Sequence, residues 1–123
     1  MHAALADPVP ASRAILSNVL LDCGLRVHEA ATTGALRSIL YAHPEVRLVL
    51  VDWNVPPDGG FGLVRELRCD ARLAGRRVIA ILTDPRGQDL AAALEAGIDD
   101  YLTRPFTPST IREKLDVLGV MAA

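Results

Sequence analysis

Four short apolar runs in this sequence are each followed at once by a polar side chain that could take part in chemistry. These side chains are Asp7, Asp52, Thr83 and Arg104. Two acids, a hydroxyl and a cation would together form a small polar site, suited to holding an oxyanion transferred to one of the acids. Phosphoryl transfer fits this set, because it needs positioning and charge neutralisation more than covalent help from the protein.

The elements that must position these residues follow an alternating pattern. Apolar runs predict strands at 2–6, 26–30, 48–53, 78–82 and 101–103. Segments with helical periodicity separate them. The first has its apolar face between Ala11 and Leu20 and is closed by Gly24, and the second carries Leu36, Ile39 and Leu40 and breaks before Pro44. The third runs through Phe61, Val64 and Leu67, the fourth covers 89–96, and a last helix begins near Thr107-Pro108 with Thr107 as its cap. This alternation predicts an α/β fold, a parallel sheet with helices on both faces. Right-handed crossovers then bring the carboxyl ends of the strands to one edge, where the four polar residues meet.

Composition narrows the class of protein. A chain of 123 residues with 50% hydrophobic and 23% charged residues predicts one globular domain, 1–123, with no output domain. No apolar run is long enough to span a membrane and no signal peptide precedes the first strand, so a cytoplasmic protein is expected. A net charge of −2 without a basic block argues against direct nucleic-acid binding. The oligomeric state stays open.

The individual residues also have plainer interpretations. Asp7 could cap the helix that follows it, and Arg104 could be a structural partner that neutralises Asp52 permanently. Asp52 is harder to explain away, because a buried strand seldom ends in an unpaired acid. Trp53 and Phe106 are expected to serve packing. His2, His28 and His43 share no metal-like spacing and are expected at the surface or at strand edges.

The chain resembles the receiver domains of two-component response regulators over essentially its whole length. The matching segments are Leu-Val-Leu-Val-Asp52-Trp-Asn-Val-Pro56, Ile-Leu-Thr83 and Gly97-Ile-Asp-Asp100-Tyr-Leu-Thr-Arg104-Pro-Phe106. Their order and spacing together are specific. The resemblance implies a flavodoxin-like sheet with strand order 2-1-3-4-5. It also implies that Arg104-Pro105 is a cis peptide.

The resemblance implies a role for each matched residue. Asp52 would accept a phosphoryl group from a histidine kinase or histidine phosphotransferase, with Mg²⁺ held by Asp7, Asp52 and the backbone carbonyl of Asn54. Thr83 would hydrogen-bond a phosphoryl oxygen, and Tyr101 would change rotamer as Thr83 moves. A downstream protein would bind the face formed by the fourth helix, the last strand and the last helix.

Three positions depart from the family pattern. Receivers usually end the first strand with two adjacent acids, whereas Asp7 is followed here by Pro8. An ungapped match gives Asp7 the position that acts on the metal through water, and a one-residue gap would instead give it direct ligation. Either way one carboxylate is lost and weaker Mg²⁺ binding is expected. The family's lysine is replaced by Arg104, and Asp84 stands where a small residue is usual.

Two hypotheses for function follow. In the first, phosphorylation of Asp52 shifts a two-state equilibrium and changes the affinity for a partner protein. In the second, the chain is a pseudo-receiver, a binding module that phosphorylation does not switch. A flavodoxin-like small-molecule binder or enzyme is a weaker third, because no GxGxxG or P-loop glycines follow the first strand. Whether the chain stands alone or belongs to a larger protein stays open.

Overall fold

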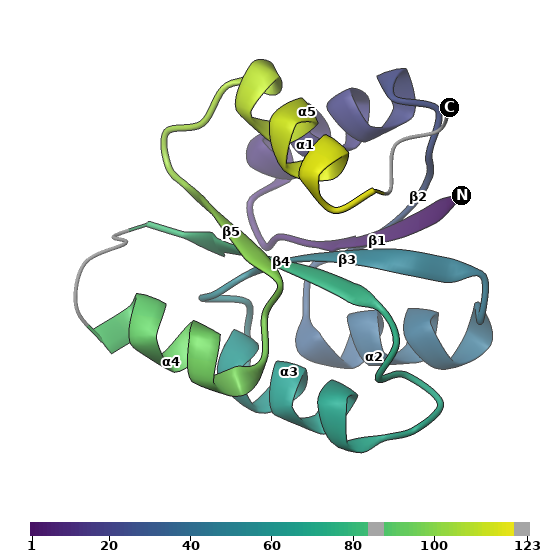
Figure 1. Ribbon diagram of the computed structural model, residues 1–123, viewed down its shortest axis with the longest axis vertical. Coiled ribbons are helices and arrows are strands. Elements are labelled where there is room, and N and C mark those ends of the chain that lie inside the picture. Colours follow the sequence, from purple (N-terminus) through teal and green to yellow (C-terminus); the bar gives the residue numbers. More distant parts are fainter. Residues whose placement is uncertain (84–87, 120–123) are drawn as a thin grey trace.

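The computed structural model describes residues 1–83 and 88–119, which form one five-stranded sheet flanked by helices (Figure 1). The strands are β1 His2–Ala6, β2 Arg26–Ala30, β3 Val46–Asp52, β4 Arg77–Leu82 and β5 Asp100–Thr103. The helices are α1 Pro10–Asp22, α2 Thr33–Ala42, α3 Gly60–Cys69, α4 Gln88–Ala96 and α5 Pro108–Val117.

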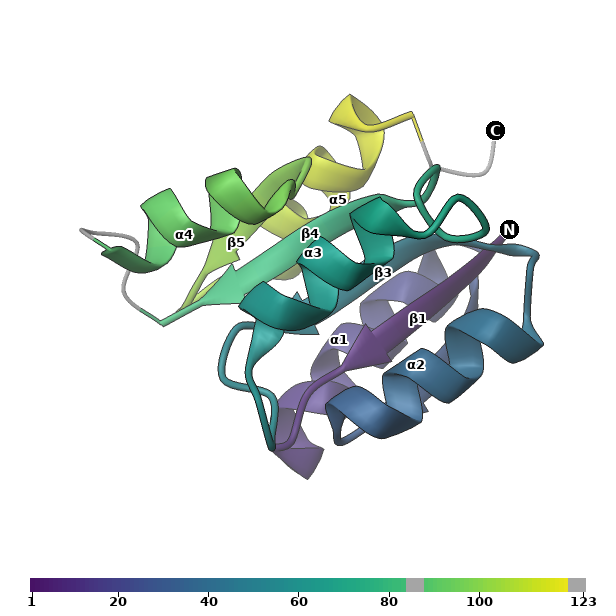
Figure 2. The same ribbon diagram turned by 90° about the horizontal axis from the view of Figure 1, so that it is seen from below.

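All strand pairs are parallel, and the spatial order is β2-β1-β3-β4-β5. Helices α1 and α5 cover one face of the sheet, and α2, α3 and α4 cover the other (Figures 1 and 2). The predicted fold class and the strand order that the resemblance implies are therefore confirmed.

The apolar runs of the central strands are unbroken because both faces of the sheet are buried. Alternate residues of β3 enter different cores: Val49 and Val51 join the side chains of α2, α3 and α4, whereas Leu48 and Leu50 join those of α1 and α5. Strand β3 begins at Val46, two residues before the predicted start, because exposed Arg47 interrupts an apolar run that starts earlier.

The helix ends follow local rules of capping. Helix α1 begins at Pro10 and is followed by Gly24, whose φ of 87° lies in the left-handed region that favours glycine. Helix α5 is capped by Thr107, whose hydroxyl accepts a hydrogen bond from the Thr110 amide, as predicted. Among the described residues, no helix is both long enough and apolar enough to cross a lipid bilayer.

The three histidines lie together at the amino edge of the sheet. His2 Nδ1 lies 3.0 Å from His28 Nε2, and the His28 ring stacks on His43 with 4.3 Å between centroids. The spacing of the histidines in the sequence could not show this grouping, because His2 and His28 meet only through the pairing of β1 with β2. Stacked rings do not direct their in-plane nitrogen lone pairs toward one point, so the cluster is not shaped as a metal site.

Candidate functional site

Asp7 and Asp52 lie side by side at the carboxyl edge of the sheet, just past β1 and at the end of β3. Asp7 is completely buried and Asp52 is 6% exposed. In each case Oδ1 accepts a hydrogen bond from the backbone N–H two residues further on, Val9 at 2.9 Å and Asn54 at 2.8 Å. These local bonds fix the orientation of both carboxylates. The other oxygen, Oδ2, takes no part in these local bonds.

The structure contradicts the interpretation of Asp7 as a helix cap. The N-cap of α1 is Val9, and no side chain caps that helix. Asp7 bonds the Val9 amide just ahead of the helix, and its own carbonyl accepts a hydrogen bond from Arg13 Nη1 at 2.8 Å. Its carboxylate faces the site, where burial would be costly without a charged partner.

That partner is Arg104, which follows β5 and joins both acids. Its Nη2 donates to Asp52 Oδ2 at 2.7 Å and to Asp7 Oδ2 at 3.2 Å. Its Nη1 donates to Ser12 Oγ at 2.6 Å, and the guanidinium lies 5.5 Å from the centre of the Phe106 ring. One cation thus holds two carboxylates from different strands.

The backbone of Arg104 is held equally firmly. Its N–H donates to the Leu82 carbonyl at 2.9 Å, which extends the β4–β5 ladder by one residue. The Arg104-Pro105 peptide is cis, as the resemblance implied. Burial acts to lower the pKa of Arg104, but hydrogen bonds to Asp52 and Asp7 outweigh it, so the pKa is raised. Two carboxyl groups thus share one guanidinium at this site.

Thr83 and Tyr101 take no part in the contacts of Arg104 described above. Thr83 follows β4 and is exposed. Tyr101, in β5, packs against the core on the α3 and α4 side, and Lys114 Nζ lies 5.1 Å from its ring centre. Asp84 lies outside the described residues. The coupled movement of Thr83 and Tyr101 stays a prediction.

Trp53 directly follows Asp52 and is 8% exposed. Its ring packs in the core, as expected. A Cβ atom on Gly60 would lie only 2.5 Å from Trp53 Cε3, so the start of α3 can approach the ring only because residue 60 lacks a side chain. This contact fixes the chain directly behind the buried carboxylate.

The oxygen atoms at this site are of a kind that binds Mg²⁺, but there are few of them. Asp7 Oδ2, Asp52 Oδ2 and the Asn54 carbonyl are oxygen ligands of the kind this ion prefers. Within the described part of the chain, no three acidic, histidine or cysteine side chains form a group suited to a metal ion. Both Oδ2 atoms point at a position where Arg104 Nη2 already lies. A metal therefore competes with the guanidinium for the same two oxygens.

A groove beside the triad was not predicted from the sequence. It has a volume of about 560 Å³ and is lined by Val9, Ala11, Ser12, Ile15, Arg104, Pro105 and Phe106. The hydrogen bond between Arg104 and Ser12 was also not predicted. It joins residues 92 positions apart, so only the tertiary fold brings them together.

A doubly wound parallel sheet with the strand order β2-β1-β3-β4-β5 defines the flavodoxin-like class of α/β proteins, and here two acids lie at its carboxyl edge. The family description "Response regulator receiver domain" matches residues 3–116, so the chain belongs to the response regulator receiver domain family. It is 32% identical over 119 residues to the chemotaxis protein CheY1 of Helicobacter pylori, covering 96% of each chain.

Solved structures agree on the fold. The chemotaxis response regulator CheY4 of Vibrio cholerae superposes with a TM-score of 0.89 at 20% identity, covering 95% of this chain and 97% of that one. The receiver domain of a Pseudomonas aeruginosa sensor histidine kinase gives a TM-score of 0.81 at 23% identity over 94% of each chain. That structure is described with a magnesium ion coordinated in its active-site cleft.

Proposed function

We propose that this receiver domain accepts a phosphoryl group on Asp52 from a histidine kinase or histidine phosphotransferase and signals through phosphorylation-dependent protein contact. The observation that carries the proposal is the position of Asp52, a nearly buried carboxylate with one oxygen fixed by a backbone amide and the other facing a single cation. Such an arrangement holds a nucleophile in place and keeps a positive charge next to it.

The transfer begins when a carboxylate oxygen of Asp52 attacks the phosphorus of a phosphohistidine. A bond forms between this oxygen and phosphorus while the P–N bond breaks, and its electron pair stays on the imidazole nitrogen. Because Asn54 holds Oδ1 and Arg104 holds Oδ2, the attack requires release of one contact. Arg104 is the partner that can move, since its side chain is 26% exposed and Asn54 donates through its backbone.

Arg104 then neutralises charge on the transferred group. A guanidinium can donate two parallel hydrogen bonds to phosphoryl oxygens, which a lysine ammonium cannot do in the same geometry. Mg²⁺, held by Asp7, Asp52 and the Asn54 carbonyl, would add further positive charge when bound. Its binding is expected to be weak, because one family carboxylate is missing and Arg104 occupies the shared position.

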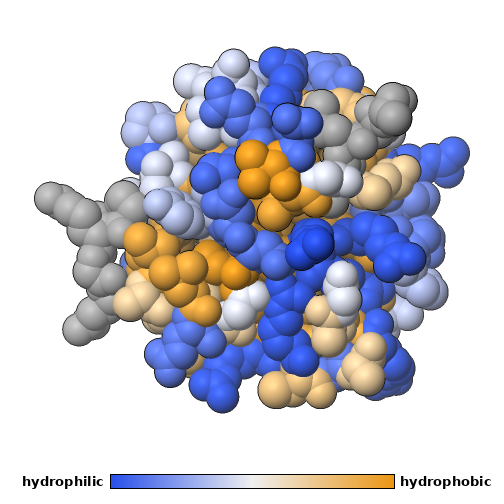
Figure 3. All heavy atoms as spheres, viewed as in Figure 1, coloured by the Kyte–Doolittle hydropathy of each residue, from blue (hydrophilic) through white to orange (hydrophobic). Residues whose placement is uncertain are grey.

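Two surfaces serve the expected partners. The groove beside Arg104 carries the exposed apolar residues Val9 and Ile15, next to the triad, and suits a phosphodonor protein. The downstream partner is assigned to α4, β5 and α5. Figure 3 shows hydrophobic atoms beside α4 and again over α5. Leu94 in α4 is 57% exposed and Val117 in α5 is 76% exposed.

The Arg104 triad also favours a second candidate function, the pseudo-receiver. If the guanidinium never releases Oδ2, Asp52 stays a structural counter-ion and the chain acts as a constitutive binding module. Both candidates share the fold and the partner surfaces. They differ in whether Asp52 gains a covalent phosphoryl group.

The test is incubation of the protein with Mg²⁺ and acetyl phosphate, followed by intact-mass spectrometry. The expected result is a gain of one phosphoryl group that is absent in Asp52→Asn, whose side chain has the same shape. A panel of phosphorylated histidine phosphotransferases should give the same product faster. No gain with either donor, in a protein shown to be folded, would refute phosphotransfer and establish the pseudo-receiver.

A further inference from the structure

A second polar pocket lies at the opposite edge of the sheet from Asp52. Its volume is about 210 Å³ and its lining is Pro44, Val46, Arg47, Ala71, Arg72, Gly75 and Arg76. Val46 is the first residue of β3, and Arg76 lies directly before β4. The pocket is therefore formed by the amino ends of two central strands and the loop between α3 and β4. We call it the arginine pocket.

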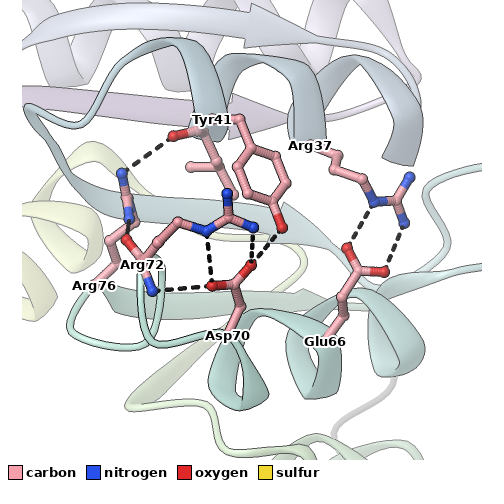
Figure 4. A network of polar contacts seen from close by, with 7 residues as sticks. Arg37, Tyr41, Glu66, Asp70, Arg72 and Arg76 are labelled. Carbon is pink, nitrogen blue, oxygen red and sulfur yellow. Dashed lines mark hydrogen bonds and ion pairs between the residues drawn. The ribbon is translucent and has the colours of Figure 1, made fainter.

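Arg76 is the most buried charge in the arginine pocket, at 6% exposure. Its Nη2 donates to the carbonyls of Leu40 at 3.2 Å and His43 at 3.4 Å, and its Nη1 to the Arg72 carbonyl at 2.9 Å. Its Nε has no hydrogen-bond partner. Among the described residues, no carboxylate pairs with it. Figure 4 shows Arg76 beside a polar network in which the neighbouring carboxylates bind other side chains.

Those carboxylates are Asp70 and Glu66. Asp70 accepts hydrogen bonds from Tyr41 at 2.6 Å and from Arg72 at 3.0 and 3.2 Å, and Glu66 binds Arg37 at 2.7 Å (Figure 4). These interactions leave neither acid for Arg76. A buried guanidinium without a counter-ion is costly, and its charge remains only partly satisfied by carbonyl dipoles at the end of α2.

Arg47 increases the positive charge of the pocket. Its side chain is exposed, and in the described part of the chain it makes no ion pair and no side-chain hydrogen bond. Burial, and then the neighbouring charge of Arg47, lower the pKa of Arg76, while Glu45 opposes them. Arg72 also lines the pocket but is paired with Asp70. Arg47 and Arg76 therefore repel each other across the same space, and Glu45 is the acid that opposes this repulsion.

We propose that the arginine pocket binds a small phosphate-type oxyanion, either free or as the monoester group of a small metabolite. A tetrahedral oxyanion fits within 210 Å³ and would supply the counter-charge that Arg76 and Arg47 lack. Guanidinium groups recognise such anions through planar, bidentate hydrogen bonds. The site is separate from Asp52, so binding involves no phosphoryl transfer and stands whether or not Asp52 is phosphorylated.

The arginine pocket also suggests what the ligand does. Arg76 joins the end of α2 to the α3–β4 loop through its carbonyl contacts. An anion seated there would neutralise the repulsion between Arg76 and Arg47 and hold these two segments together. Binding is therefore expected to stabilise the folded protein, by an amount that rises with the logarithm of the ligand concentration once this exceeds the dissociation constant.

The test is a titration of the ¹⁵N-labelled full chain with inorganic phosphate, and separately with glycerol 3-phosphate, at constant ionic strength. The expected result is saturable amide shifts at Arg47, Gly75 and Arg76, with Asp52 and Asn54 unchanged. Arg47→Gln should weaken binding about fivefold to tenfold, the loss of one charged contact. Arg112→Gln, which removes an exposed charge on α5 across the sheet, is the matched control and should bind as the wild type does.

Two kinds of result would overturn the proposal. Shifts that do not saturate, or that occur at Asp52 instead, would show that no site exists in the arginine pocket. Equal phosphate affinity in Arg47→Gln and Arg112→Gln would show that binding depends on the overall charge of the protein and not on the arginine pocket. Tighter binding of glycerol 3-phosphate than of phosphate identifies a monoester as the ligand, and the reverse identifies the free anion. Because Arg47 is exposed, this variant tests the proposal even if Arg76→Met does not fold.

Discussion

Arg104 and Arg76 stand at opposite edges of the same sheet and have opposite electrostatic surroundings. Arg104 contacts two carboxylates, Asp7 and Asp52, and is outnumbered by them. Arg76 is more deeply buried, yet it contacts only carbonyl oxygens. A buried charge therefore indicates what its site can bind through the charges of the groups that surround it. An excess of acid indicates a site that receives positive charge, and an excess of arginine indicates one that receives an anion.

The strongest test of this comparison is the substitution Arg104→Met. It leaves two buried carboxylates facing each other, so unfolding free energy should fall by about 3 kcal/mol near neutral pH. Chemical denaturation near neutral pH measures this loss. The same variant should bind Mg²⁺ about tenfold more tightly by titration calorimetry, because the guanidinium no longer competes.

A control separates charge repulsion from lost packing. In Asp52→Asn combined with Arg104→Met, the second carboxylate charge is gone, and much of the loss should be recovered. If the double variant is as unstable as Arg104→Met alone, Arg104 stabilises the protein through its packing on Phe106, and the electrostatic contrast between the two edges fails.

The matched substitution at the other edge, Arg76→Met, should cost less, about 1 to 2 kcal/mol. It removes hydrogen bonds to three carbonyls but also removes a buried charge without a counter-ion, and the two effects partly cancel. Denaturation of both methionine variants side by side gives the difference. A larger loss at Arg76 than at Arg104 would mean that its carbonyl bonds alone satisfy the charge.

The smallest expected effect concerns the histidine cluster. Burial, then the nearby charges of His43 and His2, lower the pKa of His28, with Glu45 opposing. A lowered histidine pKa means that the folded state disfavours protonation. Stability should therefore be fully present above the ordinary histidine value of about 6.5 and decrease as the pH falls below it. Thermal unfolding from pH 8 to pH 5 measures this slope.

The variant His28→Gln cannot take up that proton and should show a shallower decrease. An unchanged slope in this variant would assign the pH dependence to groups other than His28.

The fold could be predicted almost completely because each strand and helix has a local signal. The runs at 26–30 and 78–82 mark strands whose bounds the structure confirms to within one residue. Thr107 and Pro108 mark the start of α5, since capping depends on neighbours in the chain. The start of β3 was wrong because one exposed arginine breaks the pattern.

The candidate site was predicted in part. Asp7, Asp52 and Arg104 meet as expected, because parallel topology brings the strand ends to one edge. The sequence could not show that both acids bind the same guanidinium nitrogen of Arg104. Nor could it show that Ser12 binds Arg104. These depend on side-chain rotamers and on contacts between distant segments. The histidine cluster was missed for the same reason: His28 lies two residues beyond Arg26, the register partner of His2, and such diagonal contacts leave no trace in spacing.

Trp53 is the only tryptophan in the chain, and its peptide directly follows Asp52. Its ring is nearly buried and is wedged against Gly60, so it senses little of the solvent and much of this one loop. The protein thus carries its single tryptophan at the residue next to its proposed phosphoacceptor. Tryptophan emission, excited apart from that of the tyrosines, can follow events at that edge of the sheet in real time without a label.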